Sequence, residues 1–132
     1  MNPLLFDSFA LLRFLQKEPG SEKVLDLLRV AAREHNPCLL NVINFGEVLY
    51  TTQRRFGAEA RMQVFVALQQ MGIVILSCPD QLVYRAAELK AVYAMSYADT
   101  FAVASAMEHK ACLVTGDPEF RQVEHLVHIE WV

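Results

Sequence analysis

The sequence predicts a single α/β domain of three layers, with a mostly parallel central sheet of about five short strands between two layers of helices. Short apolar runs alternate along the chain with segments whose apolar residues recur at helical spacing. The chain has 132 residues, the size of one domain, and 54% of them are hydrophobic, which suffices for one core. No repeat or flexible linker divides it, so we expect residues 1–132 to form one domain.

Turn residues separate the elements predicted in the first half. Leu4–Phe6 is typical of a buried strand, and the helix that follows it ends at Pro19-Gly20. Ser21 is expected to cap a second helix, which Asn36-Pro37 stops. We then expect a brief strand over 38–40, a helix over 42–56, a turn at Gly57 and a helix over 58–70.

The second half follows the same alternation. Ile73–Leu76 is β-branched and bounded by Gly72 and a proline, which predicts a buried strand. A long helix enters through Pro79, and Ser96 opens the next one. A strand over 112–114, a Gly-Asp-Pro turn and a terminal strand over 127–131 complete the chain.

Composition limits the function classes. The chain has 12 Lys and Arg against 15 Asp and Glu, so no overall positive field attracts nucleic acid, and any such binding must be local. Three widely spaced cysteines, Cys38, Cys78 and Cys112, are expected to be small buried hydrophobes in a reducing compartment. The chain shows no signal peptide and no run of membrane-spanning length, so we expect a cytoplasmic protein. The high apolar fraction suggests a protein partner.

Four acidic residues stand out. Asp7 and Asp117 directly follow predicted strands, and the carboxyl ends of parallel strands meet at one edge of a sheet. Glu47 and Asp99 lie in apolar helical segments, where a carboxylate needs a partner. Each also has a structural interpretation: Asp7 and Asp117 fit helix caps, Ser96 to Asp99 fits a capping box, and Glu47 fits the edge of an amphipathic helix.

Convergence of these four acids would imply a metal. Carboxylates within a few ångströms repel one another unless a divalent cation neutralises them. Oxygen ligands without His or Cys suit Mg²⁺ or Mn²⁺ rather than Zn²⁺. Such an ion activates water and stabilises phosphodiester cleavage, so the pattern predicts phosphate chemistry without a nucleophilic side chain.

At these segments the sequence resembles the PIN-domain ribonucleases, and most closely the VapC-type toxins of toxin–antitoxin pairs. The similar stretches occur in the family's order over essentially the whole chain: Asp7-Ser8, Asn44 to Val48, Ser96 to Ala102, Thr115-Gly116-Asp117 with Phe120, and the end at Trp131-Val132. Phe9 stands where the family often has a smaller or polar residue and could narrow substrate access, and Gly46 stands where Ala is common. Neither departure removes an acid.

The resemblance implies a function and partners. It implies endonucleolytic cleavage of RNA with one or two Mg²⁺ or Mn²⁺ ions, a small antitoxin protein that binds the toxin, and a homodimer. The residues that would hold the metal are Asp7, Glu47, Asp99 and Asp117, with Ser8 and Thr115 as supporting hydroxyls.

Cationic residues near the acids are candidates for RNA contacts. Arg13 and Lys17, expected one helical turn apart, form one group, and Arg54 and Arg55 form another. Most such charges belong to solvated helix faces. The four histidines are scattered; His109 and His128 are expected at the surface or at an edge, without a catalytic role.

Other function classes fit less well. A dehalogenase-like phosphatase needs a second Asp, which Asp7-Ser8-Phe9 lacks. Neither this phosphatase nor a receiver domain is favoured, because no Lys stands just beyond the last strands to neutralise a phosphoryl group. A nucleotide-binding fold needs a Gly-rich loop after the first strand. The serious alternative is a non-catalytic PIN-like module that binds a partner and whose acidic pocket is vestigial.

Overall fold

The computed structural model describes residues 1–132 and contains one five-stranded sheet in the order β3-β2-β1-β4-β5. Every neighbouring pair of strands is parallel. The strands are β1 (Leu4–Phe6), β2 (Cys38–Asn41), β3 (Ile73–Leu76), β4 (Cys112–Thr115) and β5 (Ile129–Trp131). The predicted α/β class is confirmed, as is a central sheet of five short strands.

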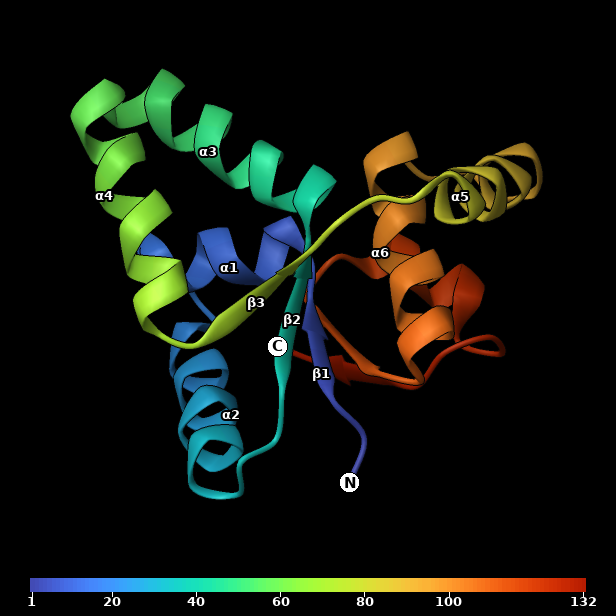
Figure 1. Cartoon of the computed structure of the whole chain (residues 1–132), viewed down its shortest axis with the longest axis horizontal. Coiled ribbons are helices and arrows are strands. Elements are labelled where there is room, and N and C mark those ends of the chain that lie inside the picture. The colour runs from blue at the N-terminus through green and yellow to red at the C-terminus, as the bar shows by residue number, and fades with distance from the viewer.

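Helices connect these strands and cover both faces of the sheet. They are α1 (Ser8–Leu15), α2 (Ser21–Arg33), α3 (Val42–Phe56), α4 (Ala58–Gln70), α5 (Asp80–Val92), α6 (Tyr97–His109) and the 3₁₀ helix η1 (Pro118–Val123). In Figure 1, α1 to α4 lie on one side of the sheet, and α5 and α6 lie on the other. This is the arrangement that right-handed crossovers produce when the chain first moves outward from β1 to β3 and then returns to β4.

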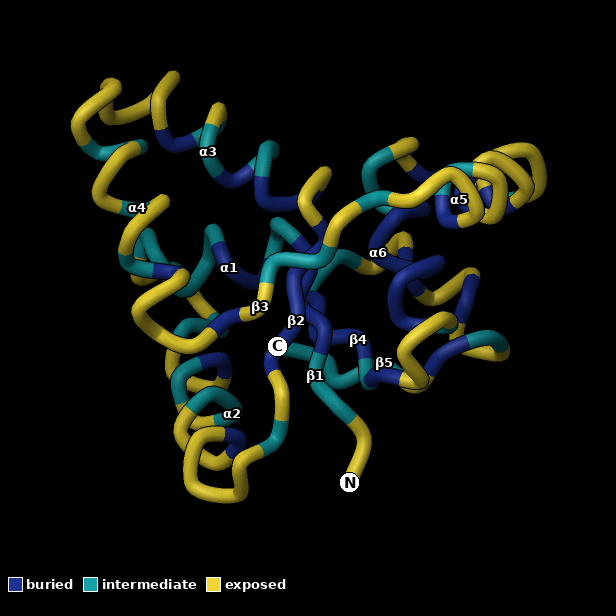
Figure 2. The backbone as a smooth tube through the Cα atoms, in the orientation of Figure 1, coloured by how far each residue is buried: buried dark blue, intermediate teal, exposed yellow.

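Alternation along the strands divides the core into two halves. Leu5, Leu39 and Leu113 pack in the cluster formed with α5, α6 and η1. Phe6, Leu40 and other residues of the opposite parity pack in the cluster formed with α1 to α4. Figure 2 shows the resulting pattern: the central strands are buried, whereas the outer turns of α3, α4 and α5 are exposed.

The order of the strands fixes the place of a site. From β1 the chain moves to β2 and β3 on one side, and later to β4 and β5 on the other. The direction therefore reverses between β1 and β4, and ligands of open parallel sheets bind beyond the carboxyl ends of the strands at such a point. Asp7 follows β1 and Asp117 follows β4.

Several details differ from the sequence-based predictions. Gly20, and not Ser21, is the N-cap of α2; it has a left-handed backbone (φ 99°), and Ser21 is the first helical residue. The strand β3 is an edge strand rather than a buried one, and the side chain of Val74 is 49% exposed. The terminal strand begins at Ile129 rather than at Val127.

The cysteines also depart in part from expectation. All three are free, and Cys38 is buried as predicted. Cys78 and Cys112 are only partly buried, because one lies in the connection after the edge strand β3 and the other begins β4 beside the edge strand β5. No helix has both the length and the apolar character needed to cross a membrane.

Candidate functional site

Asp7 lies directly after β1 and is almost completely buried. Its Oδ1 accepts the backbone N–H of Ala10 at 2.8 Å, which is the predicted cap of α1. Its Oδ2 accepts the hydroxyl of Thr115 at 2.5 Å. The second bond does not involve the helix end, so capping explains only half of the contacts of this carboxylate.

Thr115 joins two of the acids. It is the last residue of β4, and its buried hydroxyl donates to Asp7 and accepts the backbone N–H of Asp117 at 3.1 Å. Asp117 caps η1, since its Oδ1 accepts the backbone N–H of Glu119 at 2.9 Å. The ends of β1 and β4 are thus linked by hydrogen bonds through the Thr115 hydroxyl.

Glu47 is held by its own helix and by α1. Its Oε1 accepts the hydroxyl of Ser8 at 3.0 Å and the Nδ2 of Asn44 at 3.1 Å. Asn44 is buried, and its Nδ2 also donates to the carbonyl of Ala98 at 3.1 Å. Asn44 therefore ties α3 to the start of α6, while its Oδ1 is buried without a partner.

Asp99 lies half-buried in the first turn of α6. Its backbone N–H donates to the hydroxyl of Ser96 at 3.1 Å, so the predicted cap at Ser96 is confirmed. The Asp99 carboxylate in turn has hydrogen bonds with the side chain and the backbone of Ser96, as the capping-box interpretation expects.

Electrostatics show that the four carboxylates interact. Burial is the main reason that the pKa of Asp7 rises from 3.8 to about 7, and the charges of Asp99 and Asp117 add to the rise. Burial likewise raises the pKa of Asp99 from 3.8 to about 6, and the charges of Asp117 and Glu47 contribute. Hydrogen bonds from Thr115 and Ala10 in the first case, and with Ser96 in the second, oppose these shifts. The fold therefore brings the four acids close enough for their negative charges to repel one another.

A fifth carboxylate belongs to this group. The carboxylate oxygens of Asp99, Asp117 and Glu119 all lie within 4.8 Å of one another. Oxygen-only ligands are those that Mg²⁺ and Mn²⁺ prefer, and a bound cation would remove the mutual repulsion that adds to the effect of burial on the two pKa values. The residues present therefore fit a divalent cation of this class.

The loop between Thr115 and Asp117 is closely packed. A Cβ atom on Gly116 would lie 2.6 Å from Cε1 of Phe9 and 2.8 Å from the carbonyl oxygen of Val132. Only glycine fits there without displacing the C-terminal backbone or the ring. Phe9, which departs from the family pattern, is thus packed against the loop that carries Asp117.

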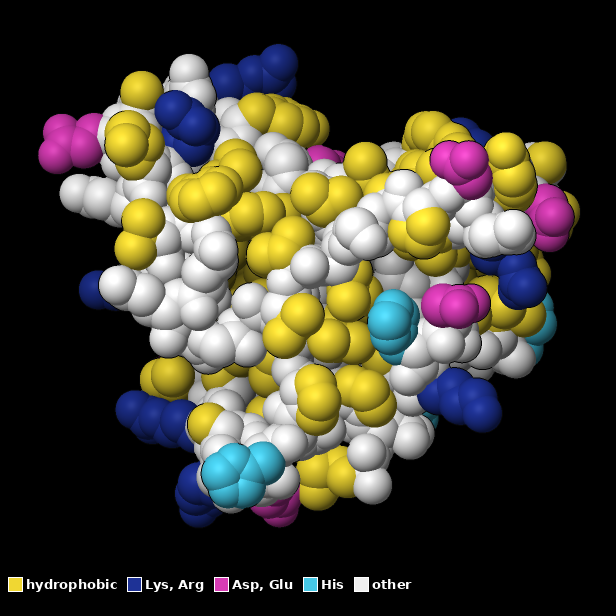
Figure 3. Space-filling view, viewed as in Figure 1, with side chains coloured by type: hydrophobic (Ala, Val, Ile, Leu, Met, Phe, Trp, Pro, Cys, Tyr) yellow, Lys and Arg dark blue, Asp and Glu magenta, His cyan; other side chains and the backbone are white.

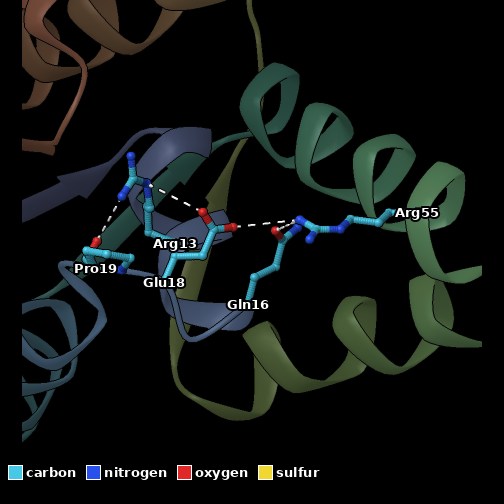
Figure 4. Close-up of polar contacts among 5 residues, drawn as sticks. All are labelled: Arg13, Gln16, Glu18, Pro19 and Arg55. Carbon is cyan, nitrogen blue, oxygen red and sulfur yellow. Dashed lines mark hydrogen bonds and ion pairs between the residues drawn. The ribbon is translucent and has the colours of Figure 1, made fainter.

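Two of the predicted RNA-contact residues share one carboxylate (Figure 4). Arg13 Nε lies 4.0 Å from Glu18 Oε2, and Arg55 Nη1 lies 3.7 Å from Glu18 Oε1. Arg13 also donates to the carbonyl of Pro19, and Arg55 donates to the side chain of Gln16. These contacts join α1 to the end of α3 and partly neutralise both arginines.

The remaining cations are arranged differently. Lys17 lies beyond the end of α1 with a left-handed backbone (φ 54°), so the expected helical turn between Arg13 and Lys17 does not exist. Arg54 stacks over the ring of Tyr50 at 5.0 Å. Arg13 stacks over Phe9 at 4.6 Å, and Phe9 contacts Gly116, so Arg13 is linked through that ring to the acidic loop.

Sequence reasoning missed two residues of this site. Asn44 lies one helical turn before Glu47, and that spacing places both on one face of α3. Glu119 lies in the first turn after the cap Asp117, where an acid is also favoured by the helix end. Both signals were present, but each has an ordinary structural meaning. His109 and His128 are exposed, as expected.

Comparisons with known proteins bear on the fold of the chain. The PIN domain family model matches residues 4–126. No curated protein sequence matches the chain.

Solved structures share the fold at low sequence identity. The DNA-bound VapBC of Salmonella typhimurium gives a TM-score of 0.76 at 14% identity, covering 98% of both chains. The promoter-bound VapBC2 of Rickettsia felis gives 0.73 at 15% identity, again covering 98% of both chains. The Mycobacterium tuberculosis protein VapC20, described as a toxin that cleaves the sarcin–ricin loop, gives 0.73 at 14% identity and covers 91% of this chain and 94% of its own.

Proposed function

The chain belongs to the PIN domain family, and on that premise we propose that it is a metal-dependent endoribonuclease acting as the toxin of a toxin–antitoxin pair. The observation that carries the proposal is the group of acids at the switch point of the sheet. Asp7, Glu47, Asp99 and Asp117 come from four separate segments, and the raised pKa values of Asp7 and Asp99 reflect their burial and mutual repulsion. Burying such charge without a ligand is costly.

Each residue has a role in this proposal. Asp99, Asp117 and Glu119 offer oxygen ligands to Mg²⁺ or Mn²⁺, and Asp7 and Glu47 complete the acidic lining. Thr115 fixes the Asp7 carboxylate, while Ser8 and Asn44 fix that of Glu47. When bound, the ion would offset phosphate charge and supply an activated water for hydrolysis.

RNA is the proposed substrate class. Phosphodiester hydrolysis is the chemistry that an oxygen-ligated divalent site serves, and one structural neighbour, VapC20, is described as cleaving the sarcin–ricin loop. The net charge of −3 means that attraction of RNA must come from local cations. Arg13 is the best placed of the candidates because it is joined to the acidic loop through Phe9; Lys17, Arg54 and Arg55 would contact phosphates farther away.

A small antitoxin and a second copy of the chain are the proposed protein partners. The neighbours from Salmonella typhimurium and Rickettsia felis are VapBC structures bound to DNA. Five large apolar side chains are exposed on α3 and α4: Tyr50, Phe56, Met62, Phe65 and Val66. Figure 3 shows hydrophobic side chains at the surface over these two helices. A monomer seldom leaves such a surface uncovered, so we propose that a partner covers it in the cytoplasm.

The proposed activity is tested with Asp-to-Asn variants. At the helix caps Asp7 and Asp117, asparagine serves about as well as aspartate, and at all three positions it lacks the charge that a divalent cation needs. We expect Asp7→Asn, Asp99→Asn and Asp117→Asn each to remove Mg²⁺-dependent RNA cleavage, measured by mapping the RNA ends that purified protein generates, while circular dichroism shows an intact fold.

The matched control is Asp80→Asn. Asp80 also lies in the first turn of a helix, but it is exposed on α5 and does not contribute to the acidic group. It should cleave as the unaltered protein does. Unchanged cleavage by all three site variants would contradict the proposed role of these acids. No Mg²⁺-dependent cleavage by the unaltered protein would instead favour the partner-binding module with a vestigial pocket.

The toxin role has a separate test. Expressed alone, the protein should arrest growth, and the Asp99→Asn variant should not. A small protein encoded beside its gene should copurify with it and suppress cleavage. A protein that cleaves RNA but is harmless when expressed would contradict the toxin role while leaving the nuclease activity standing.

A further inference from the structure

A second group of metal-ligating side chains lies away from the acids. Cys112, His128 and Glu130 place their ligand atoms within 4.8 Å of one another. They come from the start of β4, the residue before β5, and the middle of β5. Because the parallel register pairs Leu113 with Ile129 and Val114 with Glu130, these three side chains share one face of the sheet.

The ligand types differ from those of the acidic group. A thiol, an imidazole and a carboxylate are the sulfur, nitrogen and oxygen ligands of zinc, which binds at about 2.0–2.3 Å in tetrahedral geometry. Three such ligands leave the fourth position to water. The Cys112 sulfur has a hydrogen bond with the backbone of Glu130, which places it beside the next ligand of the group.

We propose that Cys112, His128 and Glu130 form a zinc site that fastens β5 to β4. Binding exchanges the S–H bond of Cys112 for a bond from sulfur to zinc, and the proton leaves to solvent. The thiolate and the carboxylate then balance the two charges of the ion, and neutral His128 supplies the third bond. The site is open to solvent because His128 is exposed and the other two residues are half-buried.

Lys23 competes with a metal ion for the carboxylate of Glu130. Its Nζ lies 3.4 Å from Glu130 Oε1, and it also donates to the carbonyl of Trp131. The lysine and glutamate side chains are 51% and 35% exposed, so this ion pair is weak, and the carbonyl bond lets Lys23 stay in place when Glu130 turns to the ion.

The proposed zinc site is distinct from the acidic group. Cys112 begins β4 and Thr115 ends it, which separates them by about 10 Å along the strand. The two groups of residues therefore do not share ligands to the same ion. It acts on β5, an edge strand of three residues with one neighbour, whose following residue Val132 donates its backbone N–H to Thr115.

Cobalt is the probe, because Zn²⁺ is spectroscopically silent and Co²⁺ bound to a thiolate gives a charge-transfer band in the near ultraviolet. Metal-free, reduced protein titrated with Co²⁺ should develop this band, and added Zn²⁺ should remove it. A variant with Cys38→Ser and Cys78→Ser, which retains only Cys112, should give the same band.

Ligand variants decide the assignment. Cys112→Ser should lose the band, and His128→Asn and Glu130→Gln should each weaken Co²⁺ binding by about 10-fold or more, because loss of a residue that only orients a ligand already costs about 10–100-fold. Asp99→Asn should keep the band, so failure of the acidic site and failure of the zinc site are distinguishable. No band in the unaltered protein, or a band that persists in folded Cys112→Ser, would overturn the proposal.

Discussion

At the scale of single residues, the Asp7 carboxylate combines two roles that sequence reasoning treats as alternatives. It caps α1 through one oxygen and accepts the Thr115 hydroxyl through the other. Its burial leaves the pKa near 7 despite both bonds. A helix cap needs neither burial nor a second donor, so capping alone does not account for the surroundings of Asp7.

We expect the metal-free protein to lose stability as the pH rises. The pKa values of Asp7 and Asp99 are about 7 and about 6 in the folded protein, against 3.8 as the ordinary value. The folded state thus keeps protons that the unfolded chain releases, and this contribution is fully present below about pH 4 and is lost as the pH rises through the two folded values. In chelator, the melting temperature should therefore fall between about pH 4 and about pH 7.

Two variants check the source of this pH dependence. Asp7→Asn removes the more strongly shifted group, so its melting temperature should vary less with pH. For a buried group the difference is on the order of a few kcal/mol across the range. Asp80→Asn should keep the slope of the unaltered protein. An equal slope in Asp7→Asn would show that the pKa of Asp7 is not raised.

At the scale of elements, close packing of the β4–η1 loop determines where Asp117 lies. The C-terminal backbone and the ring of Phe9 both approach Gly116 more closely than a Cβ atom permits. The pairing of β5 with β4 ends with the bond from Val132 to Thr115, and Val132 is thereby packed against the loop that carries Asp117. Val132 therefore supports the site through Gly116 and not through direct contact with one of the acids.

Gly116→Ala should damage both stability and cleavage. The added methyl group must displace backbone at Val132, which costs about 1–3 kcal/mol of unfolding free energy, and the shifted loop moves Asp117. Denaturant unfolding and RNA cleavage assays measure the two effects.

Gly46→Ala is the matched control. Gly46 lies inside α3 with nothing within 4 Å of its Cβ position, so alanine should stabilise the protein by about 0.5–1 kcal/mol and leave cleavage unchanged. If Gly46→Ala destabilised the protein, the open space at the Cβ position of Gly46 would be contradicted.

At the scale of the whole molecule, the acidic group should link metal binding to folding. Four segments from all parts of the chain meet there, so the site does not exist in the unfolded chain. Mg²⁺ at 100 times its dissociation constant should add about 2.7 kcal/mol of stability.

This stabilisation corresponds to a rise of about 10 °C in the melting temperature for a domain of this size. It should disappear in Asp99→Asn and persist in Cys112→Ser, because the second variant alters only the proposed zinc site. A melting temperature of chelator-treated protein that responds to neither Mg²⁺ nor Mn²⁺ at millimolar concentration would argue against a metal site among the acids.

Local patterns in the sequence determined the fold class, the five strands and the order of the four acids. Apolar runs such as Ile73–Leu76 and stops such as Pro19-Gly20 act over a few residues, and these are the distances over which helices and strands are specified. The position of Asp7 and Asp117 after strands was predictable for the same reason, since parallel strands end at one edge.

Contacts between distant segments decided the rest. Gly20 replaces Ser21 as the cap of α2 where Val132 approaches it, and Val74 is exposed because the strand order leaves β3 at an edge. The bond from Asn44 to Ala98, the approach of Glu119 to Asp99, and the meeting of Cys112 with Glu130 each join residues far apart along the chain. Local periodicity carries no information on such pairs, because they form only when the packed sheet brings separate elements together.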